Sequence, residues 1–281
     1  MQVIKRKNTI NCNGNIINLC KPVAMGIINV NNNSFYTGSR IETETALLNK
    51  VEKMLTDGAE IIDIGAQSTR PGAEEIGTEE EIKLVIPAIE LLIKAFPNII
   101  ISIDTYRAKV AENAINAGAA IVNDVSSGDD DKKMFDVIIK NKVPYILMHK
   151  QGKPKTMQQN PVYDNVVLDI MNYFIPKVEF LKQNGVADLI IDPGFGFGKT
   201  LEHNYTILKH LKDFEVFELP ILVGVSRKSM IQKVLNVNTD EALNGTTALH
   251  MAALLNGANI LRVHDVKEAV ECVKLFNMLA N

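Results

Sequence analysis

Polar side chains end most of the short apolar runs in this 281-residue chain. They mix carboxylates, amides and bases, the groups that bind polar heterocycles and anions. In chain order they are Asn29, residues 67–70, Asp104, Asn123, Asp124, His149, Asp192, residues 226–228, Arg262 and His264. One polar residue after a strand carries little information, because loops are solvated. The whole set predicts a single binding site, provided that the fold brings these strand ends together.

The elements that must position these residues follow a repeated pattern. Eight short runs rich in β-branched residues predict strands buried on both faces. These runs cover residues 23–28, 60–64, 99–103, 119–122, 144–148, 188–191, 220–225 and 259–263. Helical spacing over 43–56, 79–95, 106–117, 162–183 and 241–256 predicts helices between them. Glycines at 58, 118, 185 and 257 are suited to the left-handed residue that ends a helix.

Eight strand–helix units in a chain of this length predict an α/β fold of the (β/α)8 TIM-barrel type, with residues 1–281 as one domain. An open doubly wound sheet is the second choice. All strand carboxyl ends of a barrel open on one face, so the polar set would converge there. Residues 1–22 differ, because Asn13-Gly14 between two short runs is a type I′ turn signal. We expect a hairpin that closes the opposite end of the barrel formed by 23–281.

Composition argues against several functional classes. The chain has 30 basic and 33 acidic residues and a net charge of −3, which gives no footprint for nucleic acid. No apolar run approaches the roughly 20 residues of a membrane-spanning helix, so we expect no membrane partner. The three cysteines form no CxxC pair, which favours a reducing, cytoplasmic location.

The glycine-rich segment after the sixth strand run resembles a phosphate-binding loop but fails its pattern. Asp192-Pro193-Gly194-Phe195-Gly196-Phe197-Gly198-Lys199 has proline where the first Walker glycine belongs. The spacing also misses GxGxxG. We expect these glycines to let the backbone approach a flat ligand closely.

Seven motifs together resemble dihydropteroate synthase, in that family's order. They cover residues 25–30, 68–72, 103–105, 123–124, 192–199, 226–229 and 262–264, and the similarity runs from about residue 23 to the C-terminus. The resemblance implies a TIM barrel, usually dimeric, that joins 6-hydroxymethyl-7,8-dihydropterin diphosphate to p-aminobenzoate. The products are pyrophosphate and 7,8-dihydropteroate, in folate synthesis, and sulfonamides compete with p-aminobenzoate.

The resemblance also assigns site residues. It implies that Asp104, Asn123, Met148, Asp192 and Lys228 hold the pterin. A buried carboxylate suits adjacent N–H donors of a pterin edge, and an amide suits a mixed edge. For p-aminobenzoate the resemblance implies Lys228, Ser229, Phe197, Thr69, Arg70 and Pro71.

For the diphosphate the resemblance implies Asn29, Arg262 and His264, with Asn29 as the one protein ligand to Mg²⁺. A neutral amide does not hold a hard dication alone, so metal and substrate phosphates should bind together. The implied reaction is dissociative: the C–O bond breaks first, and the arylamine then attacks the cationic methylene. Lys228, Arg262, His264 and Asn29 are the implied catalytic residues, and positioning and electrostatics replace an enzyme nucleophile.

The sequence departs from the family pattern in its first loop. Two aspartates and a proline usual there are replaced by Asn33, Thr37 and Asn32, and Ala66-Gln67 stands where Gly-Glu is usual. We expect weaker stabilisation of the cation and a lower kcat. This departure leaves two alternatives: a pterin-binding methyltransferase and a catalytically impaired pterin-binding pseudoenzyme. Arg262 with His264 favours the synthase, since a methyltransferase needs no diphosphate pocket.

Overall fold

The computed structural model describes residues 7–30, 40–66, 76–152, 157 and 161–280. Its main sheet has eight parallel strands in the order β8-β7-β6-β5-β4-β3-β10-β9, and a parallel bridge between Ile191 and Ile221 joins the two ends. The predicted TIM barrel is therefore confirmed. The strands are β3 (Val23–Asn29), β4 (Ile61–Gly65), β5 (Ile101–Asp104), β6 (Ile121–Asp124), β7 (Tyr145–Met148), β8 (Leu189–Asp192), β9 (Leu222–Val223) and β10 (Ile260–Val263).

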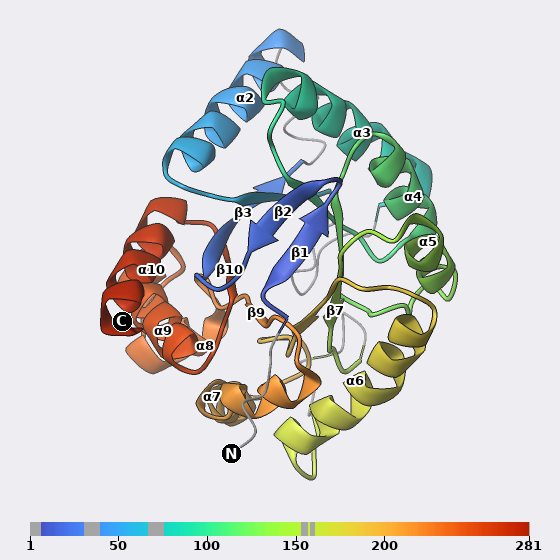
Figure 1. Cartoon of the computed structure of the whole chain (residues 1–281). Coiled ribbons are helices and arrows are strands. Elements are labelled where there is room, and N and C mark those ends of the chain that lie inside the picture. Colours follow the sequence, from blue (N-terminus) through green and yellow to red (C-terminus); the bar gives the residue numbers. More distant parts are fainter. Residues whose placement is uncertain (1–6, 31–39, 67–75, 153–156, 158–160, 281) are drawn as a thin grey trace.

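Helices surround this sheet in a ring (Figure 1). The helices are α2 (Arg40–Thr56), α3 (Thr78–Ala95), α4 (Ala108–Asn116), α5 (Met134–Asn141), α6 (Val166–Gln183), α7 (Leu201–Lys209), α8 (Ser229–Leu235), α9 (Leu243–Leu255) and α10 (Val266–Ala280), with short 3-10 helices η1 (Leu211–Phe217) and η2 (Asp240–Ala242). Among the described residues no helix is both long and apolar enough to cross a membrane.

Side-chain alternation along each strand separates two cores. In β4, Ile62 and Ile64 belong to the larger cluster between sheet and helices. Ile61, one position earlier, belongs to a second cluster inside the barrel. This alternation follows from the two-residue period of a strand. It also means that every second residue of each strand points into the barrel.

The N-terminal hairpin closes one end of the barrel, as expected. Strands β1 (Thr9–Cys12) and β2 (Asn15–Asn18) are antiparallel, and both turn residues have positive φ, +53° at Asn13 and +91° at Gly14. The hairpin lies across the middle of the ring of strands in Figure 1. Ile10 and Ile17 are buried and share the inner cluster with the first inward residues of the barrel strands. The hairpin therefore acts as an apolar plug.

The largest differences between the predicted and the observed helices concern two segments. The helix predicted from residue 162 begins at Val166, because the Asn165 side chain accepts hydrogen bonds from the backbone N–H groups of Val167 and Leu168. The helix predicted over 241–256 is divided into η2 and α9. The four glycines expected after helices all have positive φ, from +81° to +109°.

Candidate active site

On several strands the inward-facing positions change from apolar to polar within one step. The lower layer, which touches the hairpin plug, is apolar and includes Ile61, Ile121, Ile146, Ile190 and Ile260. Two residues further along, the upper layer consists of Asp63, Asn123, Met148, Asp192 and Arg262. Strand alternation therefore places most of the predicted pterin residues in one layer at the carboxyl end of the barrel.

Arg262 is bound by two carboxylates, one from this layer and one from the end of β5. Its Nε donates to Asp63 Oδ2 and its terminal NH2 to Asp104 Oδ2, both at 2.6 Å. Burial opposes the charge on Arg262, but the two carboxylates raise its pKa above the ordinary value. Burial raises the pKa of Asp104 to about 7, and Arg262 opposes that rise. Asp104 is thus a carboxyl group that titrates near neutral pH.

Asp192 and Lys228 lie near Arg262, close enough for their charges to affect one another. Burial raises the pKa of Asp192, while Lys228, the backbone N–H of Gly194 at 2.7 Å and Arg262 oppose the rise. Burial lowers the pKa of Lys228 to about 8, and Asp192 opposes that shift. The Lys228 ammonium donates to the carbonyl of Phe195 and lies 4.9 Å from the Phe197 ring centroid. The structure therefore places Asp192, Arg262, Lys228 and Phe197 at one end of the barrel.

The glycine-rich turn after β8 is packed against the segment after β7. A Cβ on Gly194 would lie 1.9 Å from the His149 carbonyl oxygen, and one on Gly198 would lie 2.2 Å from that of Gln151. At both positions the close neighbour is the protein's own backbone rather than a ligand. Glycine is needed there because both residues also have positive φ.

Lys199 fixes the same turn from inside. Its buried ammonium contacts His149 Nδ1 at 3.0 Å and the carbonyls of His149 and Phe197 at 3.2 and 3.1 Å. Burial lowers the pKa of Lys199 well below its ordinary value, and Asp192 opposes this. The sequence pattern alone gives Lys199 no role separate from the rest of the glycine-rich segment.

Ser226 orients His264. The Ser226 hydroxyl accepts from the His264 backbone N–H at 3.2 Å and lies 3.1 Å from His264 Nδ1. Since a neutral Nδ1 accepts the hydroxyl proton, this geometry favours the imidazole tautomer with its proton on Nε2. Arg227, with φ of +53°, binds both carboxylate oxygens of Asp265 at 2.8 and 2.9 Å. This ion pair fixes the loop that carries Ser226 and Lys228 next to the end of β10.

Asp124 points the opposite way from Asn123 and organises the loop after β6. Its carboxylate accepts from the backbone N–H and hydroxyl of Ser126, from the N–H of Gly128 and from the Tyr145 hydroxyl, at 2.7–2.8 Å. Burial raises the pKa of Asp124, and these hydrogen bonds oppose the rise. Asp124 therefore supports the wall of the site rather than its surface.

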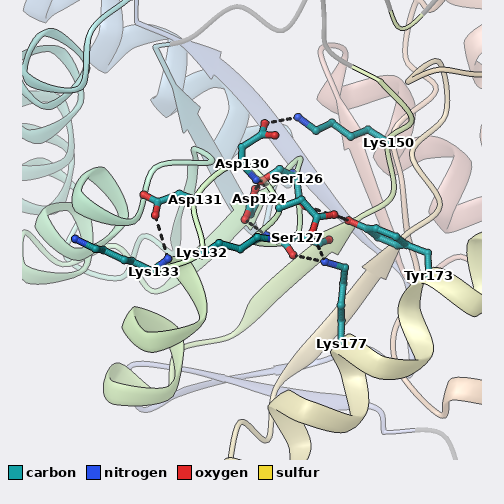
Figure 2. A network of polar contacts seen from close by, with 12 residues as sticks. Asp124, Ser126, Ser127, Asp130, Asp131, Lys132, Lys133, Lys150, Tyr173 and Lys177 are labelled. Atoms are coloured by element: carbon teal, nitrogen blue, oxygen red, sulfur yellow. Dashed lines mark hydrogen bonds and ion pairs between the residues drawn. The ribbon is translucent and has the colours of Figure 1, made fainter.

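Helix α6 completes this support. Figure 2 shows Tyr173 and Lys177 reaching from the helix to the loop after β6. Tyr173 donates to Asp129 at 2.8 Å, and Lys177 donates to the Ser127 carbonyl at 2.9 Å and to Asp129 at 2.8 Å. The Ser127 hydroxyl donates in turn to the Met148 carbonyl at 2.8 Å. The network fixes the strand ends that carry Asn123 and Met148.

Other predicted residues lie at the rim or outside the described part. Asn29, Ser229 and His264 are exposed at strand or helix ends. Thr69, Arg70 and Pro71 lie outside the described residues, as do Asn32, Asn33 and Thr37. Within the described ranges no three His, Cys, Asp or Glu side chains form a group that could hold a metal ion.

Sequence reasoning missed Asp63. It is fully buried and binds both Arg262 and, at 3.1 Å, the Nδ2 of Asn123. The available signal was a carboxylate in the middle of the apolar run at residues 60–64, where only an inward or paired position tolerates charge. Periodicity alone assigns this residue to a strand and says nothing of its place in the site.

Comparison with known proteins identifies the family of this chain. Residues 25–264 match the family described as pterin binding enzyme. A dihydropteroate synthase of Escherichia coli strain K12 is 43% identical over 267 residues, covering 93% of each chain. A Yersinia pestis dihydropteroate synthase, solved with a sulfonamide drug, has a TM-score of 0.90 and 40% identity over 97% of this chain and 99% of its own. One from Xanthomonas albilineans, solved with 4-aminobenzoic acid, has a TM-score of 0.89 and 34% identity over 97% and 98%.

Fold, site and family match define a pterin-binding TIM-barrel enzyme, and the chain belongs to the pterin binding enzyme family. Its curated relatives at 36–43% identity over most of the chain are dihydropteroate synthases. The protein is accordingly an enzyme of the transferase class.

Proposed function

We propose that this enzyme condenses 6-hydroxymethyl-7,8-dihydropterin diphosphate with p-aminobenzoate to give 7,8-dihydropteroate and pyrophosphate. The observation that carries the proposal is the polar cluster above the apolar floor of the barrel. Asp104 binds Arg262, Asn123 is joined to Arg262 through Asp63, and the charges of Asp192 and Lys228 lie close by. The names of the relatives support the same reaction.

The pterin would bind edge-on to the buried layer. Asp192, with only 6% of its surface exposed, offers carboxylate oxygens to adjacent N–H donors. Asn123 is 4% exposed and adds a donor and an acceptor. Lys228 donates to the pterin carbonyl or ring nitrogen, while Met148 forms an apolar wall. Buried polar groups of this kind discriminate strongly, because a wrong ligand leaves them unpaired.

Arg262 and His264 would bind the diphosphate. Two of the five guanidinium N–H groups of Arg262 are used by Asp63 and Asp104, so within the described part of the chain three donors remain for substrate oxygens. The tautomer favoured by Ser226 directs the Nε2–H of His264 away from Ser226 and makes it a further donor.

Asn29 fits a magnesium ion only as one ligand among several. It is an exposed neutral amide at the end of β3, and no acidic cluster stands in the described residues to supply the remaining charge. The donor set therefore fits Mg²⁺ whose other ligands are diphosphate oxygens and water. When bound there, the ion would supply charge neutralisation to the leaving diphosphate.

The chain's own residues would then act by positioning and electrostatics. Arg262 and His264 stabilise negative charge on the diphosphate as the C–O bond breaks. Asp104 and Asp192 stabilise the electron-poor pterin that remains. For p-aminobenzoate we propose the space near Lys228, Ser229 and Phe197, together with residues 69–71. The arylamine nitrogen forms the bond to the methylene carbon and gives its proton to the released diphosphate or to water, so no enzyme nucleophile is required.

Turnover tests this function. Protein supplied with dihydropterin diphosphate, p-aminobenzoate and Mg²⁺ should release pyrophosphate and dihydropteroate in equal amounts, and omission of p-aminobenzoate should stop dihydropteroate formation. Methyl transfer without pyrophosphate release would instead identify the methyltransferase alternative. Crystals soaked with both substrates and Mg²⁺ should show the diphosphate beside Arg262.

The altered first loop offers a test of the impaired-enzyme alternative. Restoring Asp at positions 33 and 37 should raise kcat or leave it unchanged, because the carboxylates would support the cation. A fall in kcat would show that this loop works differently here. Pterin binding with no turnover in either protein would identify a pseudoenzyme.

We further propose a homodimer in the cytoplasm. Large apolar side chains are exposed on the adjacent helices α8, α9 and α10: Val234, Leu235, Leu255, Leu275, Met278 and Leu279. An apolar surface of this kind is typical of a protein interface. Sedimentation should give a dimer, and Leu275→Asp should shift it toward monomer; a monomeric wild-type protein would refute the dimer.

The cytoplasmic location is supported by three unpaired cysteines and is tested by cell fractionation.

A further inference from the structure

Asp63 occupies a position that stability alone does not explain. It lies in the middle of β4, is fully buried, and is aligned with Ile27 on β3 and Ser102 on β5. Removing a carboxylate from water is costly, and a buried ion pair is often no more stable than apolar residues of similar size. The layer just below consists of apolar side chains, mostly isoleucines, so the barrel closes without charge there.

One oxygen of Asp63 serves two residues of the pterin layer. Oδ2 accepts from Arg262 Nε at 2.6 Å and from Asn123 Nδ2 at 3.1 Å. These residues come from β10 and β6, on opposite sides of β4 in the sheet order. A single carboxylate therefore fixes side chains from separate strands of the barrel relative to each other.

The contact with Asn123 selects one orientation of its amide. If the amide rotated by a half-turn, its carbonyl oxygen would face the carboxylate of Asp63, and two acceptors would repel each other. The amide nitrogen is thereby held against Asp63 and the order of donor and acceptor at the ligand is fixed. The contact with Arg262 fixes the plane of the guanidinium in the same way.

Only half of the Asp63 carboxylate is used by the described protein. Oδ1 has no hydrogen-bond partner among the described residues, and the hydroxyl of Ser102, aligned with Asp63 on β5, has none there either. Unsatisfied buried polar atoms are few in native structures, and a functional role is one of the reasons for them. All the hydrogen bonds of Asp63 among the described residues therefore go through Oδ2, to Arg262 and Asn123.

We propose that Asp63 is a positioning residue of the pterin site, which sets the Asn123 amide and the Arg262 guanidinium in the orientations that recognise the pterin and its diphosphate. This inference rests on the proposed function. Asp63 acts through its two partners, and its effect should fall on the pterin substrate rather than on p-aminobenzoate.

The test compares Asp63→Asn with Ser102→Ala. Asp63→Asn keeps the shape of the side chain but loses the charge and one acceptor. We expect the KM for the pterin diphosphate to rise on the order of 10- to 100-fold, while the KM for p-aminobenzoate changes less than about twofold. Ser102 lies in the same layer but is hydrogen-bonded to neither Asn123 nor Arg262. Ser102→Ala should therefore change both KM values by less than about threefold. Equal changes in both KM values of Asp63→Asn would overturn the proposal.

The pH profile gives a readout that a purely structural role would not move. Burial raises the pKa of Asp104; Arg262 opposes the rise, and the nearby charges of Asp63, Glu81 and Asp124 add to it. Removing the Asp63 charge should therefore lower the pKa of Asp104. The acid limb of kcat/KM for the pterin substrate should move to lower pH in Asp63→Asn and stay in place in Ser102→Ala. Where Asp104→Asn removes the limb, and so assigns it to Asp104, an unmoved limb in Asp63→Asn would contradict the proposal.

Two measurements keep the inference separate from the proposed function. Calorimetric binding of 6-hydroxymethylpterin to wild type and Asp63→Asn requires no turnover, so it tests Asp63 even if the wild-type protein fails to make dihydropteroate. If Asp63→Asn does not fold, the Nε–H of Arg262 in ¹⁵N-arginine-labelled wild type should exchange slowly with and without pterin. Rapid exchange in both states would show that Asp63 does not hold the guanidinium.

Discussion

The two ends of this barrel are built from the same strands, but the amino end contributes to stability and the carboxyl end to ligand recognition. At the amino end, inward residues such as Ile61 and Ile260 pack on Ile10 and Ile17 of the hairpin. At the carboxyl end, two residues further along, the inward positions hold carboxylates, an amide and a guanidinium. The apolar end supplies burial energy, while the polar end carries a desolvation cost and provides recognition. Residues that stabilise the barrel and residues that bind the ligand are thus only two positions apart along each of these strands.

Of the substitutions that test this difference between the two ends, Lys228→Ala should have the largest effect. The substitution removes the cation whose charge opposes the burial of Asp192 at the polar end. We expect kcat/KM to fall on the order of 10²- to 10³-fold with little change in thermal unfolding. Steady-state kinetics and circular dichroism check both parts, and near-normal activity would refute our assignment of the site.

At the apolar end the expected effect falls on stability instead. Ile10→Ala should lower the free energy of unfolding by about 2–4 kcal/mol, because the buried side chain leaves a cavity in the plug. Ile16→Ala on the next strand is a matched control, since Ile16 is 62% exposed and should cost less than about 0.5 kcal/mol. Both variants should keep the wild-type KM values. A change in KM for Ile10→Ala would show that the two ends are coupled.

The next smaller effect concerns the pH dependence of kcat/KM, which should be set by the carboxyl end of the barrel. Asp104, with a pKa raised to about 7, is ionised above that pH and protonated below it. If its carboxylate binds the pterin, kcat/KM for the pterin substrate should fall by up to about tenfold per pH unit below 7. Asp104→Asn should remove this acid limb while lowering the plateau. A limb that persists in Asp104→Asn would assign the titration to another group.

The smallest effect is expected in the turn of the plug. Gly14 has φ of +91°, and a Cβ added to it would meet no other atom within 4 Å, so Gly14→Ala should cost only backbone strain, about 1 kcal/mol. Asn13→Gly, at φ of +53°, should change stability by less than about 0.5 kcal/mol. Denaturant unfolding measures both. A cost at Gly14 as large as that of Ile10→Ala would mean that the turn, not the buried face, holds the plug in place.

The sequence by itself was sufficient for the features set by local pattern. Short β-branched runs indicated eight strands, Asn13-Gly14 indicated the hairpin, and polar residues after strands indicated the mouth of the barrel. These succeed because strand period, turn geometry and helix caps depend on neighbouring residues. The start of α6 was misplaced even though its signal was local, since Asn165 is a good N-cap that lies inside the stretch with helical periodicity.

Only the tertiary structure decided which polar groups meet. Arg262 binds Asp63, 199 positions earlier in the chain, and Lys199 contacts His149, 50 positions earlier. Asp63 stood in an apolar run, and nothing in its immediate sequence distinguishes a buried partner of arginine from an ordinary strand residue. Such pairings depend on barrel closure and on the register of every intervening strand. A single residue of slip would turn each inward side chain outward, so the chemistry of the site becomes defined only when the whole sheet has formed.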